Sequence, residues 1–191
     1  LAASAIVAPL ASCVTSSAPR FSSYPFALGV ASGSPRPDSV VLWTRLAPEP
    51  FAGGVLPPEN IGVRWEIAHD ESFREIAQHG TTIAAPEFAH SVHVEVTGLE
   101  PVRRYWYRFM AGDAISATGR TRTAPALDAA NDRLRFAFAS CQHYEQGYFA
   151  AHRHMAREAL DLVVFLRDYI YESSSGRNPV RKHNAAEPYT L

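Results

Sequence analysis

Apolar and polar residues alternate in short segments between residues 26 and 124, which is the period of a β-strand. The alternation is clearest at 63–67 and 92–96, and proline and glycine cluster between the segments. Short strands separated by turn residues are typical of a β-sandwich. We expect strands at Phe26–Ala31, Ser39–Leu46, Gly62–Ala68, His90–Val96, Arg104–Met110 and Thr118–Thr123.

The aromatic residues of this region also fit a packed sandwich. Leu99–Pro101, followed by Tyr105 and Tyr107, resembles the corner of a fibronectin type III or immunoglobulin-like sandwich. One helical turn is expected at Ser72–Ile76. Three tryptophans are expected to pack in the core or between domains, with an aromatic platform for a substrate as the alternative: Trp43, Trp65 and Trp106.

A different pattern begins beyond residue 132. Apolar residues alternate at 134–138, and 162–166 form a continuous apolar run, as expected of a strand buried on both faces. Apolar and aromatic residues between these segments recur at helical spacing, at Tyr148, His152, Met155 and Ala159. The turn-rich segment Ala124–Asp132 predicts a linker. The fold class is therefore mixed: an all-β sandwich followed by a β-α-β unit.

A thiol, a carboxylate and a phenol follow the two predicted strands. A β-α-β unit makes its strands parallel, so both end at the sheet edge where open α/β proteins bind ligands. Cys141 ends the first strand and Asp168 ends the second, and Tyr171 can return to the same place in a tight turn. Neighbouring strands lie about 5 Å apart. The pattern predicts that the thiolate and carboxylate reach one metal ion or two adjacent ions.

Each of these residues also has a structural interpretation. Cys141 fits a small buried hydrophobic residue, Asp168 a helix N-cap or loop carboxylate, and Tyr171 a packing aromatic. His143 is the histidine nearest to them in sequence, and we expect it to be a solvated loop residue. The sequence contains no glycine-rich phosphate-binding motif and no credible Ser/His/Asp triad.

Composition narrows the possible function classes. The 191 residues include 18 basic and 19 acidic residues, for a net charge of −1. This balance does not imply a nucleic-acid-binding or membrane-binding surface. Two cysteines do not make a disulfide framework, and the length allows one domain or two small ones.

Residues 1–25 begin with small and apolar residues and resemble the remnant of a signal peptide. The stretch is too short to span a membrane. We therefore expect a leader handled by the export machinery and a periplasmic, secreted or cell-surface protein. Leu10–Cys13 also fits a lipoprotein box, which makes lipid anchoring at Cys13 the alternative.

A series of spaced motifs extends from about Phe26 to Leu191. They lie at 26–33, 37–46, 138–142, 145–149, 153–155, 160–164 and 168–172. In this order they resemble the PhoD-like alkaline phosphatase/phosphodiesterase family. The resemblance implies an N-terminal sandwich domain at 26–124 and the start of an α/β metallophosphatase domain at 125–191.

The resemblance also implies a chemistry. The family hydrolyses phosphomonoesters and phosphodiesters with metal-activated water. By the resemblance, Cys141, Asp168 and Tyr171 are metal ligands, with Fe3+ and Ca2+ as the metals. Asp168 would bridge the two metals and is the catalytic candidate, and the substrate is a phosphate ester.

Two positions depart from the family pattern, which usually has His and Gly just before the aspartate. Here these positions are Phe165 and Arg167. Glycine lets the backbone approach a metal closely, whereas Arg167 places a cation beside a cationic centre and repels it. The departures predict a weakened site, an arginine that turns away, or a sequence that carries an error or a disabling mutation.

The family's catalytic domain adds further ligands that these residues do not include. We therefore expect this chain to have little or no activity, and residues 133–191 to expose apolar surface and an unpaired strand edge. The alternative function is a non-catalytic β-sandwich binding module with a vestigial phosphatase segment. A purple-acid-phosphatase-like enzyme is a third option, but it predicts histidine-rich ligation, and Cys141 argues against it.

Overall fold

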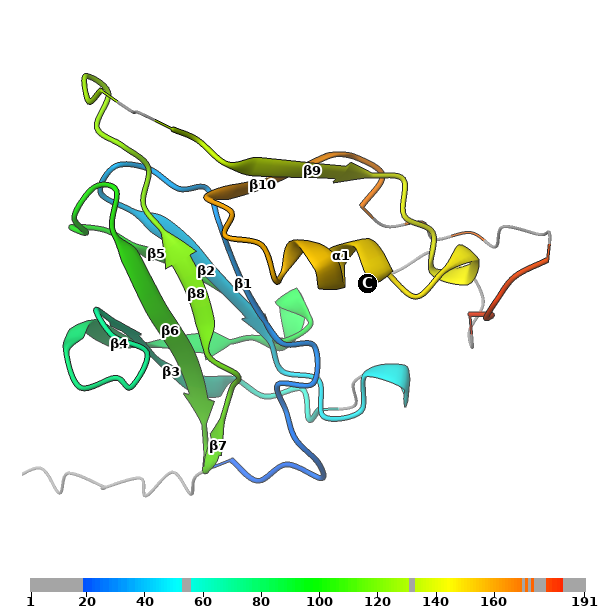
Figure 1. Ribbon diagram of the computed structural model, residues 1–191. Coiled ribbons are helices and arrows are strands. Elements are labelled where there is room, and N and C mark those ends of the chain that lie inside the picture. Colours follow the sequence, from blue (N-terminus) through cyan, green and yellow to red (C-terminus); the bar gives the residue numbers. More distant parts are fainter. Residues whose placement is uncertain are drawn as a thin grey trace, which may run out of the picture.

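The first part of the chain folds into a sandwich of two antiparallel sheets (Figure 1). The computed structural model describes residues 19–52, 56–130, 133–169, 171, 173 and 178–183. One sheet has the order β1 (Val30–Gly33), β2 (Val40–Arg45), β5 (Ser91–Val96). The other has the order β4 (Ile76–Ala84), β3 (Ile61–Ala68), β6 (Arg104–Ala111), β7 (Ala114–Ile115), and β8 (Gly119–Arg122) also pairs with β6. Two short 3-10 turns lie in the connections, at Pro50–Ala52 and Pro86–Phe88.

The core lies between the two sheets because alternate residues of their strands point inward. Leu42 of β2, Val63 of β3 and Phe109 of β6 are each 0% exposed. The same cluster contains the inward-facing valines of β5. The alternation at 63–67 and 92–96 therefore predicts the buried face correctly.

The alternation does not predict β4, which pairs with β3 along its whole length. Most side chains of β4 are small or polar, and the strand lies at the edge of its sheet. The position of β4 is therefore set by its pairing with β3. The indole of Trp65 covers Gly80, the residue directly opposite, where an added Cβ atom would lie 2.7 Å from the ring.

The expected helical turn at Ser72–Ile76 is wrong. The carboxylate of Asp70 accepts hydrogen bonds from the backbone N–H groups of Ser72, Arg74 and Glu75 at 2.9, 3.0 and 2.7 Å. The bond from Glu75 is the largest cause that lowers the pKa of Asp70. An aspartate that binds nearby backbone in this way stabilises a turn in place of a helix.

Residues 19–25 already belong to the sandwich. Phe21 packs against the core, and the N–H of Ala47 donates to the carbonyl of Pro25 at 2.8 Å. Phe26 is 2% exposed. Residues 19–25 therefore contact the sandwich, and the leader at residues 1–25 stays a prediction. Cys13 lies outside the described residues.

The other strand bounds differ from the prediction by few residues, except at the first strand. The N–H of Gly29 donates to the carbonyl of Phe26 and closes a turn there, so β1 begins only at Val30. The three tryptophans are half-buried rather than central. Tyr105 and Tyr107 are buried instead, together with Phe26 and Phe109.

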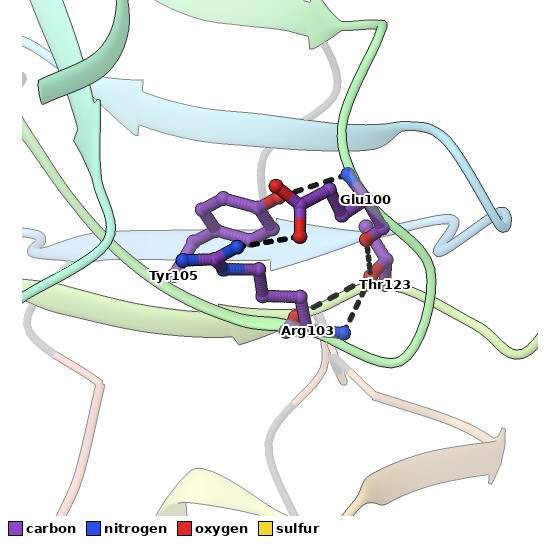
Figure 2. Close-up of polar contacts among 4 residues, drawn as sticks. All are labelled: Glu100, Arg103, Tyr105 and Thr123. Atoms are coloured by element: carbon purple, nitrogen blue, oxygen red, sulfur yellow. Dashed lines mark hydrogen bonds and ion pairs between the residues drawn. The ribbon is translucent and has the colours of Figure 1, made fainter.

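Tyr105 forms the corner that the sequence at 99–107 predicts, and Figure 2 shows its contacts. Its hydroxyl accepts a hydrogen bond from the N–H of Glu100 at 2.9 Å. The hydroxyl of Thr123 donates to the carbonyl of Glu100 at 2.6 Å and accepts from the N–H of Arg103 at 3.0 Å. The corner therefore satisfies backbone groups where the chain enters β6.

The second part of the chain is a β-α-β unit that lies beside the sandwich (Figure 1). Its strands β9 (Phe136–Ser140) and β10 (Leu162–Arg167) pair in parallel, as predicted. A 3-10 turn, Tyr144–Gln146, and the helix α1, Ala150–Met155, connect them. The register shifts between Phe165 and Arg167, which places Arg167 opposite Ser140. The residues that follow the two strands are therefore neighbours.

The helix is shorter than the spacing from Tyr148 to Ala159 predicts. Phe149 occupies the N-cap with a left-handed backbone, at φ 54°, and gives the helix no side-chain hydrogen bond. A helix without a capping side chain loses one of its usual stabilising contacts. The chain then turns at residues 156–157, and residues 158–160 lie outside the helix.

Asp161 fixes the unit to the sandwich. Its carboxylate pairs with Arg122 of β8 and also accepts a hydrogen bond from the N–H of Arg135 at 3.0 Å. The bond from Arg135, followed by the charge of Arg122, lowers the pKa of Asp161. The Asp161 N–H donates in turn to the carbonyl of Arg135 at 2.8 Å, at the start of the strand pairing.

The two strands of this unit are half-exposed, so the expectation that 162–166 is buried on both faces is wrong for this chain. Within the described residues, β9 and β10 pair only with one another. The prediction that residues 133–191 expose apolar surface is confirmed. The exposed large apolar side chains on the two strands include Phe136, Phe138, Phe165 and Leu166. In the part of the chain that the structure describes, no helix has the length and apolar character needed to cross a bilayer.

We expect the substitution Tyr105→Phe to lower the free energy of unfolding by about 1–3 kcal/mol, because it leaves the N–H of Glu100 without its partner. Urea denaturation measures the change. Tyr24→Phe is the control, since the Tyr24 hydroxyl donates to the carbonyl of Ile115 at an exposed position. Equal losses in the two variants would contradict a stabilising role for the corner.

Candidate metal centre

The parallel strands bring Cys141 and Asp168 together. Each residue directly follows its strand, and the Cys141 N–H donates to the carbonyl of Arg167 at 3.2 Å. Both residues have a left-handed backbone, at φ 57° and 45°. A non-glycine residue in this conformation is uncommon and turns the chain sharply. The Sγ atom of Cys141 lies 3.5 Å from Oδ2 of Asp168.

Tyr171 completes the cluster. Its hydroxyl donates to Oδ2 of Asp168 at 3.0 Å. Its pKa is raised, first by its hydrogen bond with Cys141, then by burial, and then by its hydrogen bond with Asp168. Three groups that can become anionic thus share protons at one point. The structure brings the three predicted residues into contact, and their role as metal ligands stays a prediction.

The cluster differs from a histidine-rich metal site. Among the described residues, no three His, Cys, Asp or Glu side chains gather closely enough to hold a metal ion. The third donor of this cluster is the phenol of Tyr171. Cys141 is exposed, whereas Asp168 and Tyr171 are half-buried. The donors are therefore accessible from solvent.

Arg167 stays close to the cluster. Its Nε atom lies 3.5 Å from Oδ2 of Asp168, and its side chain is 80% exposed. The expectation that Arg167 turns away is therefore wrong, because its guanidinium stays beside the carboxylate of Asp168. It stands where a cation would compete with a bound metal for the same carboxylate oxygen.

His143 is not a solvated loop residue, and this expectation is wrong. Its Nδ1 accepts from the N–H of Glu145 at 3.1 Å, so its Nε2 is the atom that donates to the carbonyl of Ser173, at 2.7 Å. Its ring centroid lies 5.1 Å from that of Tyr171. His143 therefore joins the loop after Cys141 to the turn that carries Tyr171.

A second contact holds the same loop from the C-terminal side. The N–H of Val180 donates to the carbonyl of Glu145 at 2.9 Å, and the N–H of His183 donates to Oε1 of Glu145 at 3.1 Å. Glu145 is 2% exposed. Arg181 donates from Nε to the carbonyl of Tyr144 at 2.5 Å. No sequence pattern predicts these contacts, because they join residues more than 30 positions apart.

A cavity of about 280 Å³ opens beside the cluster. Polar and aromatic side chains both line it. The lining residues are Ser140, Gln142, Phe149, His152, Phe165, Asp168 and Tyr169. Phe165, at one of the departures from the family pattern, thus makes part of the wall and contacts the rings of His152 and Tyr169.

Residues 12–125 match the family described as "PhoD-like phosphatase, N-terminal domain", and residues 136–191 match "PhoD-like phosphatase". The chain belongs to the PhoD-like phosphatase family. It is 56% identical over 179 residues to alkaline phosphatase D of Bacillus subtilis (strain 168), which covers 91% of this chain and 31% of the relative. These matches confirm the resemblance that the spaced motifs indicate.

A solved structure of PhoD superposes on the chain with a TM-score of 0.88 at 56% sequence identity. The match covers 91% of this chain and 34% of the solved one. The sandwich followed by the β-α-β unit is therefore a part of the PhoD fold. The chain spans about a third of the length of these two relatives.

We expect His143→Phe to loosen the loop after Cys141. The phenyl ring keeps the packing against Tyr171 but cannot bind Glu145 or Ser173. Protection of the Glu145 amide against hydrogen exchange should fall about five- to tenfold, the equivalent of one lost hydrogen bond. NMR of the labelled chain measures it, and His154→Phe, at an exposed position of α1, is the control. Unchanged protection would show that His143 does not hold the loop.

Proposed function

We propose that this chain supplies part of the metal centre of an exported phosphate-ester hydrolase of the alkaline phosphatase D type. The observation that carries the proposal is the contact of Cys141, Asp168 and Tyr171 at the ends of two parallel strands. Membership of the PhoD-like phosphatase family supports the reaction class. The substrates are phosphomonoesters or phosphodiesters.

The donor set fits a trivalent ion together with a hard divalent ion. A thiolate, a carboxylate and a phenolate together bring three negative charges to a metal. The pKa of Tyr171 is raised first by its hydrogen bond with Cys141 and then by burial and its hydrogen bond with Asp168. We assign Fe3+ to Cys141, Asp168 and Tyr171. Carboxylate oxygen also suits Ca2+, so we assign Asp168 as the residue that bridges the two ions.

When bound, the metals supply Lewis-acid polarisation of the phosphoryl group and lower the pKa of the attacking water. The chain's own residues hold the donors in place and shape the approach to them. The left-handed backbone at Cys141 and Asp168 turns both side chains to one point. The cavity beside Asp168 leaves space for the alcohol portion of an ester.

The proposal divides the chain into two functional parts. The sandwich, at 26–124 with the contacting residues 19–25, supports the metallophosphatase segment at 125–191 through the Arg122–Asp161 ion pair. A leader in the first residues would direct export to the periplasm, the cell surface or the medium. The substrate in this proposal is a phosphate ester, and the net charge of −1 does not imply a nucleic-acid partner.

Iron(III) added to the chain should give a visible absorption band from charge transfer between the Tyr171 phenolate and the metal. We expect Tyr171→Phe to lose the band, and Cys141→Ser and Asp168→Asn to weaken iron binding about tenfold or more, because each removes an anionic donor. Absorption titration measures both effects. Tyr169→Phe is the matched control, since Tyr169 is 64% exposed.

A chain that binds no iron beyond the level of Cys141→Ser would contradict the proposed metal centre. It would favour the alternative of a sandwich binding module whose second part has lost its chemistry. A band that persists in Tyr171→Phe would instead show that another group ligates the iron.

Replacing Arg167 by Gln should raise the affinity for iron about three- to tenfold at low salt, because it removes a cation 3.5 Å from the bridging carboxylate. Arg167→Gly should raise the affinity for iron at least as much. The gain should shrink as salt screens the charge. Arg157→Gln, at an exposed position after α1, is the control. An affinity that falls in both Arg167 variants would mean that the arginine supports the site.

A further inference from the structure

Arg181 lies at the centre of an aromatic cluster on the loop that follows Cys141. Its guanidinium carbon lies 3.7 Å from the ring centroid of Tyr144, 4.9 Å from that of Phe149 and 5.1 Å from that of Tyr148. A guanidinium over an aromatic face within about 6 Å is attracted to it. Three rings around one cation hold both the cation and the rings in place.

Hydrogen bonds also join the segment that contains Arg181 to the loop that carries the three rings. Arg181 donates from Nε to the carbonyl of Tyr144. The hydroxyl of Tyr148 donates to the carbonyl of Val180 at 3.2 Å, and the N–H of Val180 donates to the carbonyl of Glu145. The segment 178–183 is thus bound to the loop 144–149 through backbone and side-chain groups together. We call these two segments, with their contacts, the Arg181 clasp.

The Arg181 clasp connects to the candidate metal centre through one residue. Tyr144 and Glu145 follow directly after His143, which contacts Ser173 and the ring of Tyr171. Cys141 lies two residues before His143. The clasp therefore contacts residues that directly follow His143, and His143 packs on Tyr171.

We infer that Arg181 is a positioning residue for the metal centre, acting through the loop 143–149 on Cys141 and Tyr171. This inference rests on the proposed function, since it assumes that these residues bind metal. The charge of Arg181 by itself would predict the opposite effect on metal affinity. A cation that acted on the centre through its charge would oppose metal binding, whereas a cation that orders the ligand loop favours it. The sign of the effect on metal affinity therefore separates the two.

The test compares Arg181→Met and Arg181→Lys with Lys182→Met, which removes the neighbouring exposed cation. We expect Arg181→Met to weaken iron(III) binding about tenfold, as the hydrogen bond to Tyr144 and the attraction to the rings are lost. Arg181→Lys should recover part of the affinity, because it keeps a cation but not the planar fork. Lys182→Met should leave affinity unchanged or slightly raised. All titrations are made where denaturation curves show each variant to be folded.

A second readout needs no metal. In the metal-free chain, Arg181→Met should lower the hydrogen-exchange protection of the Glu145 amide and shift the NMR signals of the Tyr171 ring, and Lys182→Met should change neither. In a double-mutant cycle with His143→Phe, the two losses of iron affinity should combine to less than their sum, because both act through one loop.

The outcomes distinguish the inference from the proposed function. If the unmodified chain binds no iron, the proposed function fails and the metal-free signals decide whether the clasp orders the loop. Iron affinity that is unchanged or raised in Arg181→Met overturns the positioning role while leaving the metal centre intact. A Tyr171 signal that does not respond to Arg181→Met overturns it in the metal-free chain as well.

Discussion

The parallel pairing of β9 and β10 is the constraint on which the candidate site depends. It makes two residues 27 positions apart, Cys141 and Asp168, follow neighbouring strands at one sheet edge. An antiparallel pair would place these residues at opposite edges, and the donors could not meet. The register shift between Phe165 and Arg167 refines this placement, because it aligns the last residues of the two strands.

The pairing in turn depends on how the unit joins the sandwich. Asp161 holds Arg135 at the start of the two strands and Arg122 on the sandwich at the same time. This carboxylate is largely shielded, with 16% of its side chain exposed, so its interaction with Arg122 is screened less than that of a free surface pair. One residue therefore joins the beginning of β10 to Arg122 of β8.

The strands of the unit carry more apolar surface than their own pairing covers. Phe138 is 64% and Leu166 62% exposed, although both lie in strands. Exposed apolar side chains contribute little to folding, whereas the loops after the strands make further contacts. His143 and Arg181 provide these contacts on the side of the donors, by hydrogen bonds and ring contacts. Order at the site thus comes from its loops as well as from the sheet.

The sequence by itself determined the inward faces of β2, β3, β5 and β6, the Tyr105 corner and the β-α-β order that joins Cys141 to Asp168. These follow from periodicity and chain direction, which are local properties. Tertiary structure alone decided the place of β4, the role of His143 and the Arg181 clasp. Each depends on a partner distant in sequence: Trp65 over Gly80, Ser173 beside His143, and three rings around Arg181. No local pattern encodes such a partner, because its identity is set by packing.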